Sequence, residues 1–85
     1  MATIDLNNDI QLIENLLRDT SGKEIPAFEI FKDKEFQFCF IHKTSVDAIL
    51  SEESGLDYNG KIQRLTELAE KTISLKVPEP GVAGV

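Results

Sequence analysis

Cysteine, histidine and tryptophan are nearly missing from this chain of 85 residues, which has one cysteine, one histidine and no tryptophan. Because Cys39 is alone, it cannot form an intramolecular disulfide, and a cysteine-rich zinc site is excluded. One histidine adds too few ligands for a conventional structural metal site. The glycine spacing fits neither a phosphate-binding loop nor a dinucleotide-binding fingerprint. We therefore expect neither a metal nor a cofactor.

Long apolar runs are also missing from the sequence. None approaches the roughly 20 residues that a membrane-spanning helix needs. The first residues, Met-Ala-Thr-Ile-Asp-Leu-Asn, have neither the basic nor the apolar region of a signal peptide. We expect a cytoplasmic protein with no membrane contact. The hydrophobic content of 41% and the charged content of 28% are ordinary for a folded globule, and the length predicts one domain.

Positive charge is scarce, because nine Lys and Arg stand against fifteen Asp and Glu, which gives a net charge of −6. Such a field repels the phosphates of nucleic acids at long range and favours a partner with a basic surface. Solubility alone explains such acidity in many small cytoplasmic proteins, so that alternative stays open.

The apolar residues of segment 5–19 recur at the spacing of one helical face, which predicts an amphipathic helix. They are Leu6, Ile10, Ile13 and Leu17. Asp5 is expected to cap the start of this helix, and Gly22 is expected to stop it in a left-handed conformation.

Two strand-like segments follow at residues 25–31 and 35–42, and the polar turn between them predicts an antiparallel hairpin. The second strand alternates, so that three aromatic side chains share one face and the residues between them point the other way. The aromatic residues are Phe36, Phe38 and Phe40. We expect these three rings to bury against the helices.

Two further helices are predicted, a short one over residues 44–53 and a longer one that begins at residue 59 or 60 and ends near residue 74. The fold class is therefore α+β, with the element order α-β-β-α-α and a hairpin packed against helices. Residues 1–76 form the single domain, and residues 77–85 are expected to be a flexible tail. Since a two-stranded sheet is marginal alone, either the helices cover it closely or a second copy extends it.

No pair of side chains in the sequence predicts catalysis. Cys39 and His42 lie three residues apart on one strand, so their side chains leave from opposite faces and cannot form a nucleophile–base pair. Neighbouring carboxylates such as Glu52 and Glu53 are expected in solvent rather than in a desolvated cleft. We therefore expect a protein that is not an enzyme.

Residues 34–41 have the aromatic rhythm of the RNA-recognition strand, in which alternate aromatic side chains stack on bases. Glu35 and Gln37 replace both glycines of that pattern, and the net charge repels phosphate. We expect no nucleic-acid partner. The alternative is a dimeric nucleic-acid-associated regulator that binds through the lysines around the hairpin, which are Lys32, Lys34 and Lys43.

Acidic side chains are the predicted binding residues. Three project from the first predicted helix, and three more, with one tyrosine, lie around the connection between the last two helices. The predicted partner-binding set is Asp9, Glu14, Asp19, Glu52, Glu53, Asp57 and Tyr58. If these residues converge, they form an acidic surface suited to a basic site on a protein partner, with the tyrosine as its aromatic contact.

These observations lead to the hypothesis of a small, acidic, non-enzymatic protein-binding protein that occludes or scaffolds a protein partner. Small acidic inhibitors encoded by phages use this strategy, so the hypothesis includes an inhibitor or accessory factor from a phage or another mobile element. A structural subunit of a larger assembly is a further alternative. An exposed sheet edge would favour self-association as a homodimer.

One resemblance covers residues 27–74. It rests on a hairpin strand with a cysteine among apolar residues (Phe38-Cys39-Phe40-Ile41), the short helix Val46-Asp47-Ala48-Ile49-Leu50, and the final helix Ile62-Gln63-Arg64-Leu65-Thr66-Glu67-Leu68-Ala69-Glu70-Lys71. This order of features resembles a small uncharacterised bacterial family with no assigned activity. The resemblance implies an α+β fold and assigns no functional residues.

Overall fold

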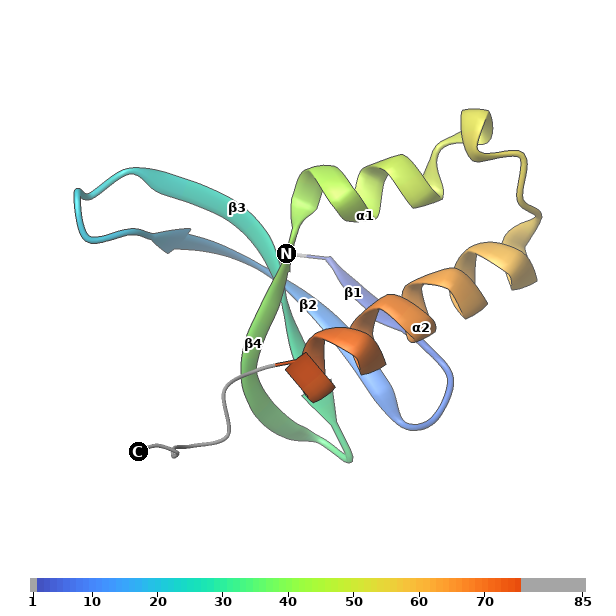
Figure 1. Cartoon of the computed structure of the whole chain (residues 1–85), viewed down its shortest axis with the longest axis horizontal. Helices are drawn as coiled ribbons and strands as arrows, with labels where there is room; N and C mark the ends of the chain where they lie inside the picture. The colour runs from blue at the N-terminus through green and yellow to red at the C-terminus, as the bar shows by residue number, and fades with distance from the viewer. Residues whose placement is uncertain (1, 76–85) are drawn as a thin grey trace.

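The protein is a four-stranded antiparallel sheet followed by two α-helices, in a computed structural model that describes residues 2–75 (Figure 1). The strands stand in chain order across the sheet, β1-β2-β3-β4. Their bounds are β1 Thr3–Asp5, β2 Ile10–Arg18, β3 Glu24–Lys32 and β4 Glu35–His42. The helices are α1 Lys43–Leu50 and α2 Tyr58–Leu75, and the short 3-10 turn η1, Glu52–Ser54, lies between them. The predicted tail, residues 77–85, lies outside the described residues.

The α+β class is confirmed, but the predicted order α-β-β-α-α is wrong, because the chain begins with strands. The segment 5–19, predicted to be a helix, instead contains the last residue of β1, a tight turn and all of β2. Asn8 and Asp9 have φ of 61° and 60°, and the Asn7 carbonyl accepts a hydrogen bond from the Ile10 N–H at 3.2 Å. Asn and Asp tolerate this left-handed conformation better than other non-glycine residues, so this short polar stretch turns the chain.

The helical spacing of the apolar residues in this segment has a different origin. Ile10 and Leu12 point to the helix side of the sheet and are 1% and 0% exposed. Ile13 and Leu17 point to its other side and are half-buried. Because this strand carries apolar residues on both of its faces, their spacing along the sequence matches the spacing expected for one face of a helix.

The β3–β4 hairpin and the last two helices are confirmed with small shifts of their ends. Asp33 and Lys34 form the hairpin turn with φ of 52° and 65°, and Lys32 pairs with Glu35 across it. Two consecutive positive φ values are typical of the two-residue turn that matches the twist of antiparallel strands. Neither helix of residues 2–75 is long and apolar enough to cross a membrane.

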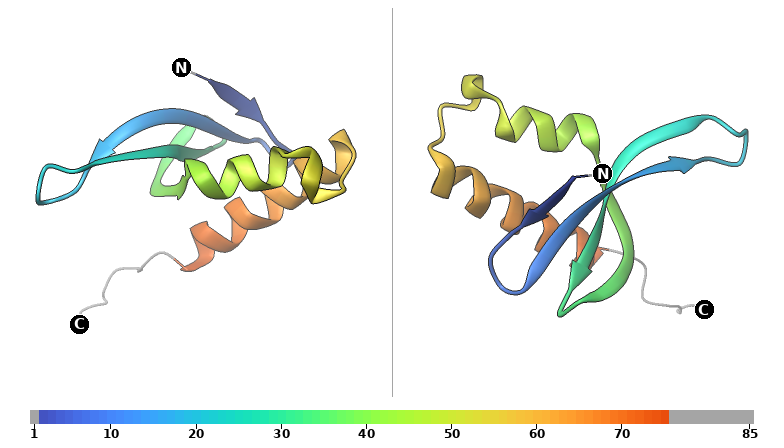
Figure 2. Two further views of the ribbon diagram at one scale, coloured as in Figure 1. Left: turned by 90° about the horizontal axis from the view of Figure 1, so that it is seen from above. Right: turned by 180° about the vertical axis from the view of Figure 1, so that it is seen from behind.

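Both helices pack on one face of the sheet (Figure 2). The buried core between these two layers consists of Ile10, Leu12, Phe28, Ile30, Ile41, Val46, Leu65 and Ala69. One polar group in this layer, the buried Thr66 hydroxyl, donates to the Ile62 carbonyl at 2.7 Å and accepts from the Asn7 N–H at 3.2 Å. Thr66 therefore ties the β1–β2 turn to the middle of α2.

The distal part of the β2–β3 hairpin projects from the body as an arm (Figure 1). In the described part of the chain, no strand pairs with it on either side, because β1 pairs with β2 only over residues 11–13 and β4 pairs with β3 only over residues 27–32. At its tip, one carboxylate oxygen of Asp19 accepts hydrogen bonds from the Ser21 N–H and hydroxyl and from the Lys23 N–H. These bonds hold the loop that reverses the chain.

Candidate protein-binding surface

The sheet face opposite the helices is open and rich in apolar side chains. Pairing of Leu12 with Ile30 and of Phe28 with Ile41 defines the helix side, so side chains of alternate parity point to the other side. No helix among residues 2–75 packs on this open face. Its apolar residues are Ile13, Leu17, Ile25, Ala27, Phe31, Phe36 and Phe40.

The prediction that Phe36, Phe38 and Phe40 bury against the helices is wrong. Phe38 is 81% exposed and Phe40 is 38% exposed, whereas Ile41 on the opposite face is 5% exposed and lies in the core. The alternation of β4 was predicted correctly, but the helices cover the face that carries its smaller side chains. Three aromatic residues are consequently left on the outer face.

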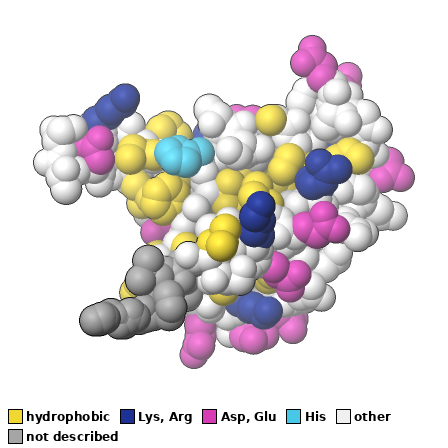
Figure 3. Space-filling view, viewed as in Figure 1, with side chains coloured by type: hydrophobic (Ala, Val, Ile, Leu, Met, Phe, Trp, Pro, Cys, Tyr) yellow, Lys and Arg dark blue, Asp and Glu magenta, His cyan; other side chains and the backbone are white. Residues whose placement is uncertain are grey.

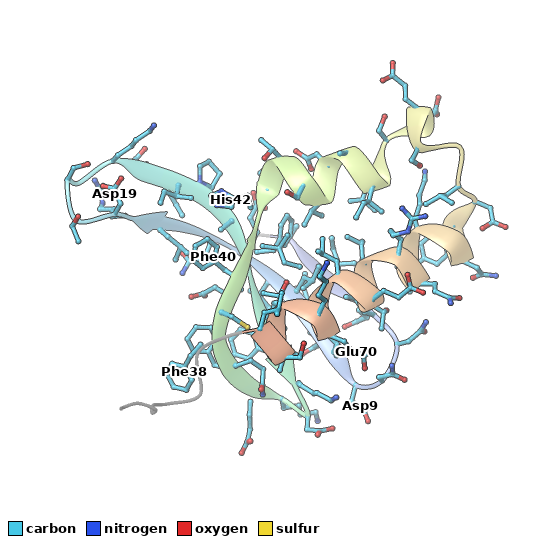
Figure 4. All side chains as sticks on the ribbon, in the orientation of Figure 1. Asp9, Asp19, Phe38, Phe40, His42 and Glu70 are labelled. Carbon is cyan, nitrogen blue, oxygen red and sulfur yellow. The ribbon has the colours of Figure 1, made fainter. Side chains whose placement is uncertain are left out.

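Aromatic side chains of β3 and β4 form two contacting groups on this side of the sheet, and we name them together the aromatic edge. Phe31, Phe36 and Phe38 form one group, and Phe40 and His42 form the other. Ring centroids are 5.3 Å apart for Phe31 and Phe36 and 4.8 Å apart for Phe36 and Phe38. Phe40 and His42 meet edge to face at 5.5 Å. Figure 4 shows Phe38, Phe40 and His42 on the side of β4 that faces away from α2. In Figure 3, hydrophobic atoms surround the only histidine where β4 meets the arm.

The backbone of Phe38 has φ of 57°, in the left-handed region that an aromatic residue seldom adopts. The register explains the geometry: Phe31 pairs with Phe36 and Glu29 pairs with Phe40, so three residues of β4 oppose the single Ile30. Phe38 lies at the centre of this bulge. Strained backbone that presents a large exposed ring is an arrangement that internal packing does not explain, and such strain is common at binding sites.

A shallow hollow of about 370 Å³ adjoins the bulge, where the end of α2 approaches β4. Its lining is mainly apolar and consists of Phe38, Cys39, Phe40, Thr72 and Leu75. Leu75 is 69% exposed, so two of the most exposed apolar side chains of the described residues border one hollow. Exposed apolar groups that gather in this way mark an interaction surface more often than isolated ones do.

The charges around the aromatic edge have mixed signs. Glu29 lies opposite Phe40 on the open face, and its Oε1 accepts from the Asn15 side-chain amide at 3.1 Å. Glu35 stands at the first residue of β4, while Lys43 directly follows the last. Lys43 Nζ lies 3.6 Å from a carboxylate oxygen of Glu14. Of these charged residues, only Glu29 lies on the open face, where it places a negative charge beside Phe40.

The predicted acidic set is divided over the molecule. Figure 4 places Asp9 and Asp19 at opposite ends, Asp9 in the β1–β2 turn and Asp19 at the tip of the arm. Glu14 lies on β2, where it pairs with Lys43 and accepts from the Ala2 N–H at 3.2 Å. These three residues do not form one face, because the helix on which that expectation depended is a turn and a strand.

The remaining four residues of the set lie close along the chain in the connection between α1 and α2. Glu52 and Glu53 belong to η1, and the Asp57 carboxylate accepts from the Gly60 N–H at 2.7 Å as α2 begins. Tyr58 is 73% exposed. We name this group, Glu52, Glu53, Asp57 and Tyr58, the acidic end.

The pair considered for catalysis is separated. Cys39 packs against the core on the helix side, while His42 is exposed and contacts Phe40 on the open face. Within residues 2–75, no group of three or more His, Cys, Asp or Glu side chains is placed to hold a metal ion.

Comparison with known proteins adds no relative: no family model, no curated protein and no solved structure matches this chain. The resemblance over residues 27–74 therefore stays a prediction.

Proposed function

We propose that this chain is a non-enzymatic protein-binding protein that holds its partner through the aromatic edge. The observation that carries this proposal is Phe38, which is 81% exposed on strained backbone in the outermost strand. Burying an aromatic side chain of this size contributes about 2 kcal/mol, and aromatic residues dominate the energetics of many interfaces. A partner that covers Phe38 supplies what the fold leaves uncovered.

Edge strand β4 supports the proposal independently of its side chains. Within residues 2–75 it is the last strand of the sheet order, after β3, and the edge of a sheet is where a strand of another chain can add. Strand addition at a sheet edge takes its affinity from the main chain and its specificity from alternate side chains. The aromatic residues at alternate positions of β4 fit this mode of recognition.

A nucleic-acid ligand is the second candidate, because exposed aromatic residues on an open sheet face also form a base-stacking platform. The charges argue against it. Glu29 stands beside Phe40 on that face, and the chain has a net charge of −6. Phosphate would be repelled where the bases would stack.

The acidic end is an alternative protein-binding surface, suited to a basic partner. One experiment separates the two surfaces: a tagged chain is used to isolate its partner, and three forms are compared. We expect Phe38→Ser to lose the partner, and we expect the triple charge reversal Glu52→Lys, Glu53→Lys, Asp57→Lys to keep it. The opposite pattern would assign the function to the acidic end.

The nucleic-acid candidate needs its own measurement. Fluorescence anisotropy of labelled poly-dT and poly-U oligonucleotides at low salt should show no binding at micromolar protein. Binding that Phe38→Ser abolishes would replace the protein partner with a single-stranded nucleic acid.

A further inference from the structure

We infer that the protein partner presents an arginine side chain to Glu29, on the open face of the sheet beside Phe40. This inference rests on the proposed function, because it names the chemistry of the partner that covers the aromatic edge. Glu29 lies on β3, and its direct cross-strand neighbours are Ile13 on β2 and Phe40 on β4. A carboxylate therefore stands in the middle of a face whose surrounding side chains are mainly apolar.

The Glu29 carboxylate is half-buried, and no basic side chain of residues 2–75 forms an ion pair with it. The two basic residues of the strands, Arg18 and Lys32, point to the helix side, where they pair with Glu24 and Glu70. Water screens a half-buried charge less than a fully exposed one. A cation from another molecule therefore binds Glu29 more strongly than it binds an acid in open solvent.

The hydrogen bonds around Glu29 leave acceptors for a guanidinium group. Glu29 Oε1 accepts from the Asn15 side-chain amide at 3.1 Å, while Glu29 Oε2 accepts no hydrogen bond from the described part of the chain. The side-chain oxygen of Asn15 likewise accepts none from residues 2–75. A guanidinium carries five N–H donors in one plane, so it can donate to Glu29 and to Asn15 at the same time.

Phe40 supplies an aromatic surface for the same group. It lies directly opposite Glu29 and is 38% exposed. Directly opposed side chains of an antiparallel pair have Cβ atoms about 5 Å apart, so a cation that reaches the carboxylate also lies within about 6 Å of the ring, the range of a cation–π contact. Arginine suits this position better than lysine, because its planar group stacks on a ring and also donates two parallel hydrogen bonds to a carboxylate.

The surface around Glu29 favours an arginine that belongs to a protein chain. Its apolar side chains extend over three strands and include Ile13, Phe31 and Phe40. Free arginine would leave most of these side chains in water, whereas a segment with apolar residues beside its arginine covers them. Arginine is enriched among the residues that dominate the energetics of interfaces. The net charge of −6 also attracts a basic segment at long range.

A defined peptide tests the inference. The probe is a short capped peptide with one arginine between leucines, and the control ligand carries citrulline, a neutral isostere, in place of the arginine. Each is titrated into the isotope-labelled chain and followed by NMR. We expect the resonances of Asn15, Glu29 and Phe40 to shift with the arginine peptide. The citrulline peptide should bind about tenfold more weakly, because it lacks the charge-assisted hydrogen bonds.

Two variants of the chain complete the experiment. Glu29→Gln removes the charge but keeps an acceptor for the Asn15 amide, so it should stay folded by circular dichroism and bind the arginine peptide about tenfold more weakly. The matched control is Glu35→Gln. It removes the same charge from the helix side of the sheet, where Glu35 pairs with Lys32 across the hairpin, and should bind the peptide as the wild type does.

Three results would overturn the inference: no shift in the wild type with the peptide at about 5 mM, equal binding of the two peptides, or undiminished binding by Glu29→Gln. The proposed function is judged separately, with the partner that the tagged chain isolates. If Phe38→Ser loses that partner and Glu29→Gln keeps it at unchanged affinity, the proposed function stands and the inference about arginine fails. Loss of the partner in both variants would support both.

Discussion

The rings of Phe36 and Phe38 lie 4.8 Å apart at an angle of 44°, although Phe36 is half-buried and Phe38 is 81% exposed. The bulge in β4 brings them together, because it keeps both rings on the outer side of the strand while the backbone of Phe38 turns through positive φ. The two neighbours consequently have different roles. Phe36 packs beside Phe31, whereas the Phe38 ring is exposed to solvent and available for contact with a partner.

This difference predicts that substitutions of the two residues change the free energy of unfolding by different amounts. Phe38→Gly relieves the left-handed strain, about 1–2 kcal/mol, and loses a ring contact of about 0.5–1.5 kcal/mol, so the free energy of unfolding should change by less than about 1 kcal/mol. Phe36→Ala should cost about 2–3 kcal/mol, because it removes a half-buried ring from regular strand. Urea denaturation of the two variants at low protein concentration measures both values. A larger loss in Phe38→Gly than in Phe36→Ala would make Phe38 a packing residue.

The outward face of β4 could not be assigned from the sequence. Alternation in residues 35–42 correctly separated the three phenylalanines from Cys39 and Ile41. Ring size then suggested that the aromatic side would be buried. In the fold, α1 directly continues β4 and α2 crosses it, and both lie on the side of Cys39 and Ile41. Tertiary topology, which the local pattern does not contain, decides which side is covered.

Substitutions of Asp9 in the β1–β2 turn distinguish the observed turn from the predicted helix. The two structures predict changes of opposite sign in the free energy of unfolding. In the turn, Asp9 has φ of 60°, so Asp9→Ala should lower the free energy of unfolding by about 1 kcal/mol, while Asp9→Gly should leave it equal or higher. In a helix, alanine would stabilise and glycine would destabilise. Thermal unfolding of the two variants distinguishes the structures directly. If Asp9→Ala were more stable than the wild type, the result would support a helix in this segment and contradict the turn.

The missed turn had a visible signal. Asn7, Asn8 and Asp9 are consecutive residues of the two types that most readily adopt left-handed conformations. Their position inside an apparent helical period of apolar residues concealed that signal. Of the predicted acidic set, only the acidic end kept its local grouping, because its members lie within one short connection. The expectation that Asp9, Glu14 and Asp19 share one face required the predicted helix, and in the observed turn and strand these residues lie apart.

Thr66 supplies a prediction about the link between sheet and helix. Its hydroxyl accepts from the Asn7 N–H at 3.2 Å, and Thr66→Val removes this acceptor at a nearly constant volume. We expect a loss of about 1–1.5 kcal/mol in the free energy of unfolding, because a partly buried N–H is left without that acceptor. Hydrogen exchange of the Asn7 amide should also accelerate.

Thr72 offers a matched control on the same helix. Its hydroxyl donates to the Leu68 carbonyl at 2.8 Å, as the Thr66 hydroxyl does to the Ile62 carbonyl, but no N–H of the sheet in residues 2–75 donates to it. Thr72→Val should therefore change the free energy of unfolding by less than about 0.5 kcal/mol. Equal losses in the two variants would show that the helix-internal bond, and not the bond to Asn7, accounts for the effect.

The tip of the arm should respond to pH through Asp19. Hydrogen bonds from the Ser21 hydroxyl and from the Lys23 N–H lower the pKa of Asp19 below its ordinary value of 3.8. A lowered pKa in the folded state means that the carboxylate holds the loop above pH 3.8 and releases it as the pH falls through the folded value. Amide resonances of Ser21 and Lys23, followed by NMR from pH 6 to pH 2, should shift together in this acid range.

Asp19→Asn is the control for this titration, because the amide oxygen still accepts both N–H bonds but has no proton to gain near this pH. Its loop resonances should stay constant over the same pH range, while those of the wild type move. Constant resonances in the wild type would show that the carboxylate does not hold the loop. A midpoint above 3.8 would contradict the direction of the pKa shift and, with it, the strength of the three hydrogen bonds at the tip.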